Sequence, residues 1–196
     1  LRPDIDGDRI RETIGYMVKK GHMFSVTSTI HGGNMDMMDD IYRSFKSMGA
    51  SFCYSPSLRM GCGLDNEDLY MDADAYADRC IEMFETWIHD KDTQIPVMPF
   101  NQYVQSALNS PNVSDCAHSS CLTRWICVYP DGSVYPCGKP CTDAYLMGNI
   151  NEVSTIDELF KSEGFRKILV DSIARREKCK SCEIFPKCGG GCTVDA

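Results

Sequence analysis

Apolar residues in the first third of the chain alternate between helical and strand-like spacing. Residues 10–20 carry apolar side chains at helical intervals and end in a basic turn before a glycine, which predicts a helix that ends there. Residues 24–30 and 50–55 are rich in β-branched and aromatic side chains and predict strands, and residues 38–49 predict the helix between them. This order predicts a βαβ unit with parallel strands. Because two strands alone do not form a stable sheet, we expect the unit to belong to a larger sheet or barrel.

A longer helical pattern follows in residues 77–88. We interpret its apolar stripe as the core-facing side of a helix, made of Ala77, Cys80, Ile81, Phe84, Trp87 and Ile88. Gln94-Ile95-Pro96 closes this segment, and Pro111 lies in a polar linker. We therefore expect one domain over residues 1–112 and a second over residues 113–196.

The second domain has a different pattern. Residues 125–129 and 133–135 flank Pro130-Asp131-Gly132, which predicts a β-hairpin. A capped helix is predicted to begin at Ser154, and its apolar face continues beyond Gly164.

Composition narrows the class of protein. A hydrophobic fraction of 43% and a charged fraction of 24% are typical of a globular protein, and no apolar run approaches the ~18 residues of a membrane span. The net charge of −8 argues against nucleic acid as a partner. The polar start of the chain predicts no signal peptide, and because the first residue is not Met we expect the chain to start inside a longer parent.

Cysteine content is the unusual feature: the chain has 12 cysteines, most of them in the second domain. Without an export signal, we expect a reducing compartment such as the cytoplasm, where clustered thiols indicate metal binding or catalysis. The sharpest motif is Cys179-x2-Cys182-x5-Cys188-x3-Cys192, with glycines before the last cysteine. Four thiolates so close together repel unless a cation neutralises them, so we expect a metal. The spacing leaves iron–sulfur and zinc both open, although two iron–sulfur clusters account for more of the cysteines than one zinc ion.

Several short motifs resemble the SPASM domain, the auxiliary-cluster region of radical SAM enzymes that modify peptides and proteins. They are Asp131-Gly132-Ser133-Val134-Tyr135-Pro136-Cys137, Met147-Gly148-Asn149-Ile150, Glu158-Leu159-Phe160 and the C-terminal cysteine motif. The resemblance covers roughly residues 116–192 and implies two auxiliary 4Fe–4S clusters for electron transfer or substrate engagement. The earlier strand–helix–strand pattern is similar to the late part of a radical SAM barrel. The expected fold is thus α/β plus α+β: a remnant of a partial (β/α) barrel, then a small cysteine-rich domain with a β-hairpin and helices.

The same resemblance implies the metal ligands. The first cluster would be held by Cys121, Cys137 and Cys192, with Cys116 as the fourth ligand. The second would be held by Cys179, Cys182 and Cys188. We interpret Cys127 as a core thiol, and Cys141 as either a ligand or a bystander.

The sequence departs from the family pattern in three places. The family's final cysteine, expected beyond Cys192, is absent, so the second cluster would have an open site, take an outside ligand or be lost. No C-x3-C-x2-C motif is present, so we expect this polypeptide alone not to cleave S-adenosylmethionine. Sulfatase-maturing members have Asp after the hairpin cysteine, whereas Gly138 follows Cys137 here, which favours a different peptide-modifying relative.

The remaining expectations concern partners and alternatives. Site-lining loops follow the strands of such barrels, and the resemblance implies that this edge faces S-adenosylmethionine in an intact parent, which makes Ser28 and Asn34 candidate contacts. The expected partners are a peptide or protein substrate and a missing N-terminal radical SAM half, with no nucleic acid or membrane. Two alternatives are a non-catalytic zinc-binding module and a stand-alone peptide-recognition partner of a separate radical enzyme.

Overall fold

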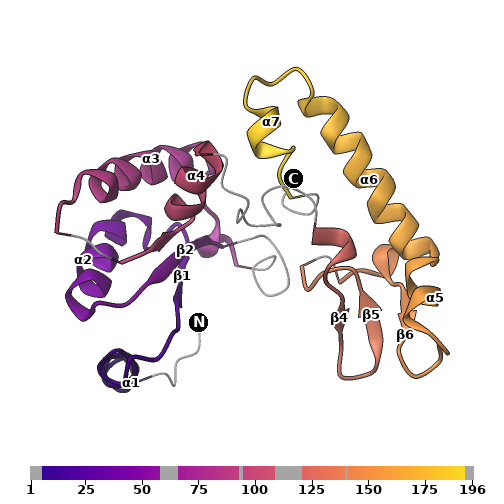
Figure 1. Ribbon diagram of the computed structural model, residues 1–196, viewed down its shortest axis with the longest axis horizontal. Helices are drawn as coiled ribbons and strands as arrows, with labels where there is room; N and C mark the ends of the chain where they lie inside the picture. Colours follow the sequence, from indigo (N-terminus) through magenta and orange to yellow (C-terminus); the bar gives the residue numbers. More distant parts are fainter. Residues whose placement is uncertain (1–5, 58–65, 93–94, 109–120, 140, 193–196) are drawn as a thin grey trace. The chain divides into compact units, whose positions relative to one another are not determined.

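The chain divides into two compact units, residues 1–104 and 105–196, whose elements are labelled in Figure 1. The domain boundary expected near residue 112 lies outside the described part of the chain. The computed structural model describes residues 6–57, 66–92, 95–108, 121–139 and 141–192.

The first unit alternates helices with the strands of one parallel sheet. Its three strands are ordered β1-β2-β3, with Val26 of β1 opposite Phe52 of β2, and Phe52 opposite Val97 of β3. The predicted parallel βαβ unit is therefore confirmed, and β3 is a third strand that the sequence pattern did not predict. The elements are α1 (Gly7–Lys19), β1 (Val26–Ile30), η1 (Met35–Met37), α2 (Met38–Met48), β2 (Phe52–Pro56), η3 (Glu67–Leu69), α3 (Ala73–His89), β3 (Val97–Met98) and α4 (Phe100–Ala107).

The core of this unit forms where the central strand meets the helices. Phe52 and Tyr54 alternate along β2 and are both almost fully buried, as expected for the covered face of a strand. The Tyr54 hydroxyl donates to the carbonyl oxygen of Met38 at 2.7 Å, which ties β2 to the start of α2. Gly49 caps the C-terminus of α2, and its φ of 66° is left-handed, a conformation that glycine adopts without steric strain.

The apolar stripe expected on α3 is wrong in part. Ile81 and Ile88 are 62% and 45% exposed, whereas Met83, which the pattern omitted, is fully buried. The side of α3 that packs against the core carries Tyr76, Cys80, Met83, Phe84 and Trp87. Apolar residues occupy more of this helix than one face can bury, so spacing alone did not identify the buried side.

Over its described residues, the second unit combines a small antiparallel sheet with the α-helices α5, α6 and α7. β4 pairs with β5 around the turn at Gly132, and β5 pairs with β6. Val134 on the middle strand is fully buried in a core with Leu159 and Ile168. The elements are η4 (Cys121–Thr123), β4 (Cys127–Val128), β5 (Ser133–Tyr135), η5 (Asp143–Tyr145), β6 (Gly148–Asn149), α5 (Ile156–Phe160), α6 (Glu163–Cys179) and α7 (Phe185–Cys188).

The single helix expected to begin at Ser154 is divided into α5 and α6, and the N-cap of α5 is Thr155 rather than Ser154. Thr155 is the N-cap of α5, and its backbone N–H donates to the Glu158 carboxylate at 3.1 Å, as in a capping box. Ser162 caps α6 by accepting from the backbone N–H of Phe165. This second cap interrupts the apolar pattern, which continued across both helices without showing the break.

None of the helices in the described parts of the chain has the length and apolar character needed to cross a membrane.

Candidate metal centre

The C-terminal cysteine motif begins where α6 ends. Cys179 is the last residue of α6, and the backbone N–H of Cys182 donates to its carbonyl oxygen at 2.9 Å. The chain therefore turns directly after the helix and keeps the two cysteines within one turn. Cys179 is half-buried, and Cys182 is exposed.

A run of left-handed glycines connects Cys188 to Cys192. Gly189, Gly190 and Gly191 have φ values of 65°, 93° and 70°, a region that L-residues with side chains adopt only with strain. The backbone N–H of Gly189 donates to the carbonyl oxygen of Phe185 at 2.7 Å and caps α7. The glycines thus curl the chain back just before Cys192.

Arg175 holds this curled segment. Its Nε donates to the carbonyl oxygen of Gly190 at 2.8 Å, and its Nη2 would lie 3.4 Å from a Cβ placed on Gly191. Its Nη1 is buried and has no hydrogen-bond partner among the described residues. Sequence reasoning missed Arg175, because no local motif marks an arginine whose partner lies 15 residues further along the chain.

The β4–β5 hairpin positions Cys137, another of the expected metal ligands. The Asp131 carboxylate accepts from the backbone N–H of Ser133 at 2.9 Å, which lowers the pKa of this carboxyl group. Gly132 adopts a φ of 86° at the turn. Cys137 follows the short β5 strand and is half-buried, so the turn fixes how far Cys137 lies from β4.

Three cysteines gather beside this hairpin. The Cys141 thiol lies 3.6 Å from the carbonyl oxygen of Cys137, and a Cβ on Gly138 would lie 3.7 Å from the Cys127 sulfur. Burial and, to a smaller extent, the neighbouring Cys141 raise the pKa of Cys127. A hydrogen bond with Cys141 raises the pKa of Tyr129 to about 12. Cys127 is therefore not the buried core thiol that its position in a strand suggested: it is half-buried and interacts with Cys141.

The expected ligands do not converge into a closed set. Cys121 in η4 and Cys192 are half-buried, and Cys188 at the end of α7 is exposed. Within the described residues, no three Cys, His, Asp or Glu side chains surround a point that could hold a metal ion, and Cys116 lies outside them. The two ligand sets therefore remain predictions.

The local chemistry nevertheless fits a sulfur-ligated metal group. All ten described cysteines are free thiols, the state from which thiolate ligands form. The curled glycine segment leaves no side chain between Cys188 and Cys192. The buried Nη1 of Arg175 supplies a donor for an anionic group beside that segment.

The two candidate contacts in the first unit differ in their surroundings. The Asn34 side chain closes the turn after β1: its Oδ1 accepts from the backbone N–H of His31 at 2.8 Å, and its Nδ2 donates to the carbonyl oxygen of Thr29 at 3.0 Å. Ser28 is half-buried in β1. Asn34 therefore has a structural role in this turn, and contact of either residue with S-adenosylmethionine remains a prediction.

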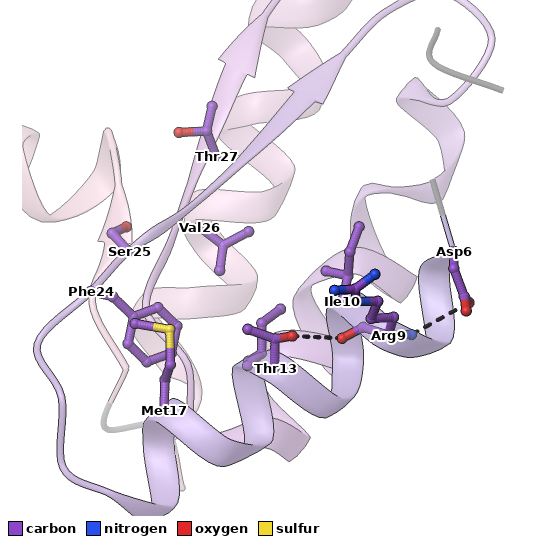
Figure 2. A pocket seen from close by; sticks show the side chains of 10 residues that line it. Asp6, Arg9, Ile10, Thr13, Met17, Phe24, Ser25, Val26 and Thr27 are labelled. Carbon is purple, nitrogen blue, oxygen red and sulfur yellow. Dashed lines mark hydrogen bonds between the residues drawn. The ribbon is translucent and has the colours of Figure 1, made fainter. Parts of the chain in front are cut away.

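A groove in the first unit lies between α1 and the start of β1 and has a volume of about 580 Å³. Figure 2 shows Ile10 and Met17 from α1, Phe24 from the segment before β1, and Val26 from the first position of β1. Its lining is mainly apolar and contains no cysteine or histidine. The groove is thus distinct from the thiol chemistry of the second unit.

Comparison with known families defines the class of the second unit. Residues 116–183 match the SPASM family, described as an iron–sulfur cluster-binding domain. The second unit therefore contains a SPASM domain, and the resemblance stated from its motifs is confirmed.

The particular relatives are anaerobic sulfatase-maturating enzymes. The chain is 27% identical over 176 residues to the cysteine-type enzyme of Clostridium perfringens (strain 13 / Type A), covering 86% of this chain and 46% of that protein. It is 24% identical, with the same coverage, to the enzyme of Clostridium novyi (strain NT). The chain thus spans about half the length of these curated relatives. Because both relatives are sulfatase-maturating enzymes, they do not support the expectation, drawn from Gly138, of a different peptide-modifying relative.

Solved structures agree on the fold. The chain aligns with native anSMEcpe with bound AdoMet at a TM-score of 0.77 and 22% identity, covering 94% of this chain and 51% of that chain. It aligns with native anSMEcpe with bound AdoMet and the Kp18Cys peptide at a TM-score of 0.73 and 20% identity, covering 94% and 52%. The mixed α/β architecture therefore matches that enzyme fold over about half its length.

Proposed function

We propose that this chain is the cluster-binding C-terminal portion of a radical SAM enzyme that modifies a peptide or protein side chain. The observation that carries the proposal is the SPASM match over residues 116–183, in a unit whose described cysteines are all free thiols. Curated relatives that mature sulfatases support a peptide or protein substrate.

In this proposal, two groups of cysteines hold two auxiliary 4Fe–4S clusters. When bound, the clusters supply one-electron transfer or a coordination site for substrate. Cys116, Cys121, Cys137 and Cys192 hold the first cluster. Cys179, Cys182 and Cys188 hold the second cluster. The hairpin turn and the glycine segment position Cys137 and Cys192.

The first unit is proposed to be the late part of a radical SAM barrel. Its strands are parallel, and β1 lies at one edge of the sheet, where an N-terminal half could add further strands. The coverage of about half of each relative supports such a missing half. Cleavage of S-adenosylmethionine belongs to that half, because this sequence has no C-x3-C-x2-C motif. Ser28 and Asn34 are the proposed contacts with the cofactor from this side.

Gly138 follows Cys137, where the resembled sulfatase-maturing members have Asp, whereas the curated relatives are themselves sulfatase-maturating enzymes. We therefore propose a peptide or protein substrate without assigning it to sulfatases or to another protein class.

The test is the iron, sulfide and zinc content of the chain after anaerobic purification and reconstitution, together with its visible spectrum. Brown protein with roughly four to eight irons and matching sulfide, as one or two cubane clusters require, supports the proposal. Colourless protein with about one or two zinc ions and no sulfide supports the zinc-binding module instead. Formation of 5′-deoxyadenosine by the isolated, reconstituted chain would contradict the assignment of S-adenosylmethionine cleavage to another segment.

A further inference from the structure

Arg175 is anchored at one nitrogen and unsatisfied at another. Its Nε donates to the carbonyl oxygen of Gly190 at 2.8 Å, so the guanidinium cannot turn away from the glycine segment without breaking this bond. The guanidinium is a planar fork whose donors lie in fixed directions. Anchoring Nε therefore also fixes the direction of Nη1.

The Nη1 atom is buried and has no hydrogen-bond partner among the described residues. None of the ion pairs found between described residues includes Arg175. A buried donor without a partner costs about 1–3 kcal/mol, and more when it is charged, so such groups are rare in native proteins. The position is therefore suited to an anionic group that completes it.

The residues next to the guanidinium in the glycine segment indicate the kind of anionic group that would accept from Nη1. Nη2 would lie 3.4 Å from a Cβ on Gly191, and the next residue is Cys192, a proposed cluster ligand. A thiolate-ligated iron–sulfur cluster has several sulfur acceptors, and hydrogen bonds to these sulfurs set its reduction potential. A positive charge beside the cluster also stabilises its reduced form, which carries one more negative charge.

We propose that Arg175 is a positioning residue of the cluster that Cys192 ligates: Nε holds the curled glycine segment, and Nη1 donates a charge-assisted hydrogen bond to a sulfur atom of that cluster. This inference rests on the proposed function. In this proposal, one arginine both holds the glycine segment in its curled conformation and raises the reduction potential of the cluster.

The experiment compares variants of the full 196-residue chain after anaerobic reconstitution. R175M removes both the charge and the donors, and R175K keeps the charge but cannot provide the planar fork. R166M is the matched control, because Arg166 is an exposed residue of the same helix. D195N removes a carboxylate that follows Cys192 in the sequence. Iron and sulfide are measured first, and a redox titration followed by electron paramagnetic resonance then gives each cluster's midpoint potential.

We expect R175M to lower the midpoint potential of the cluster that Cys192 ligates by about 59 mV. For a one-electron couple, this is a tenfold shift in the redox equilibrium. R175K should lower it less, because the charge remains. R166M and D195N should leave both potentials at their wild-type values. In the metal-free chain, R175M should speed hydrogen exchange at the amides of the glycine segment, since the bond to Gly190 is lost.

Three results would overturn the inference, and they are distinguishable. If R175M takes up clusters whose potentials equal those of R166M, Arg175 has only a structural role, even if the iron content falls. If D195N reproduces the shift, the partner of the guanidinium is that carboxylate and not a sulfur atom. If the wild-type chain takes up neither iron nor sulfide, the proposed function fails and this inference fails with it.

Discussion

The side-chain amide of Asn149 donates a hydrogen bond to the carbonyl oxygen of Asp131 at 2.9 Å, so β6 braces the hairpin turn between β4 and β5. This contact brings the Asn149 side chain directly over Gly132. A Cβ on Gly132 would lie 2.4 Å from the Asn149 Oδ1, well inside van der Waals contact. The turn that leads to Cys137 therefore requires glycine for reasons of both space and backbone conformation.

Replacing Gly132 with alanine tests this requirement. We expect G132A to destabilise the chain by about 2 kcal/mol, because a left-handed non-glycine residue is strained and Asn149 must move. Urea unfolding monitored by circular dichroism measures the change. G138A is the control, since its Cβ would meet the Cys127 sulfur at an ordinary 3.7 Å, and it should cost less than about 0.5 kcal/mol. Equal losses of stability in the two variants would contradict the requirement for glycine at position 132.

Gly164 should be the least tolerant glycine near the start of α6. A Cβ there would lie 2.1 Å from the backbone carbonyl oxygen of Leu146, and a backbone atom cannot rotate away as a side chain can. We expect G164A to cost about 3 kcal/mol, at the upper end of overpacking effects. The neighbouring E163A, at an exposed position of the same turn, should cost about 0.5 kcal/mol through the helix dipole. A thermal melt that ranks E163A below G164A in stability would contradict the packing described here.

An ion pair between α2 and the end of α3 predicts a pH dependence. The Asp90 carboxylate accepts from Lys46 Nζ at 2.6 Å and from the Tyr42 hydroxyl at 2.7 Å, and these bonds hold its pKa below the ordinary value of 3.8. A carboxyl group with a lowered folded-state pKa stabilises the fold above its unfolded pKa, and this stabilisation is lost as the pH falls through the folded pKa. D90N should therefore be less stable than wild type at pH 7, and the difference should narrow as the pH falls below about 4.

The control for this pH dependence is D92N, two residues further on at an exposed position. It removes the same charge without touching Lys46 or Tyr42, and its stability should follow wild type over the whole range. Urea midpoints measured from pH 7 to pH 3 give the comparison. A constant gap between wild type and D90N across that range would show that protonation of Asp90 does not govern the effect.

Thiol reactivity should separate the cysteines of the two units. Cys182 and Cys188 are exposed, whereas burial raises the pKa of Cys53 and of Cys80. Because the thiolate is the reactive form, iodoacetamide at pH 8 should label the exposed pair about tenfold faster in the metal-free chain. Mass spectrometry of tryptic peptides gives the rates. Cluster loading should slow labelling of the exposed pair and leave the rates of Cys53 and Cys80 unchanged.

Removal of one proposed ligand should remove one cluster. C188S should lower the iron content from about eight to about four per chain, because a cubane that keeps only two of its cysteines from this chain is not retained. C80S is the matched control: Cys80 lies against the core of the first unit, and its loss should leave iron and sulfide unchanged. Iron content that falls equally in both variants would point to general unfolding rather than to a lost ligand.

Periodicity predicted most of the secondary structure and did less well on which side of an element is buried. The first two strands and the helix between them follow from runs of apolar residues bounded by glycine. On α3, the fully buried Met83 was overlooked because bulkier apolar residues surround it in the sequence. β3 has only two residues, too few for a period to be visible, and its position depends on pairing with β2.

The candidate site was predictable where it is local in sequence. The spacing of Cys179, Cys182, Cys188 and Cys192 indicated metal binding, and the turn at Gly132 indicated the hairpin. The proximity of Cys127 to Cys141 depends on strand register, which sets Cys127 opposite Tyr135, and register follows from the folded turn. The contact between Arg175 and Gly190 joins a helix to a loop after two changes of chain direction, and neither sequence segment signals the other.

The position of Arg175 on α6 also means that the helix fixes the direction of Cys179 relative to the arginine. Arg175 lies four residues before Cys179, the last residue of the same helix, so both project from one face. Each residue turns an α-helix by about 100°. A single residue inserted between them would therefore rotate Cys179 away from Arg175 while leaving both side chains intact. The spacing of four residues thus sets the direction of Cys179 relative to Arg175, whatever residues occupy the three positions between them.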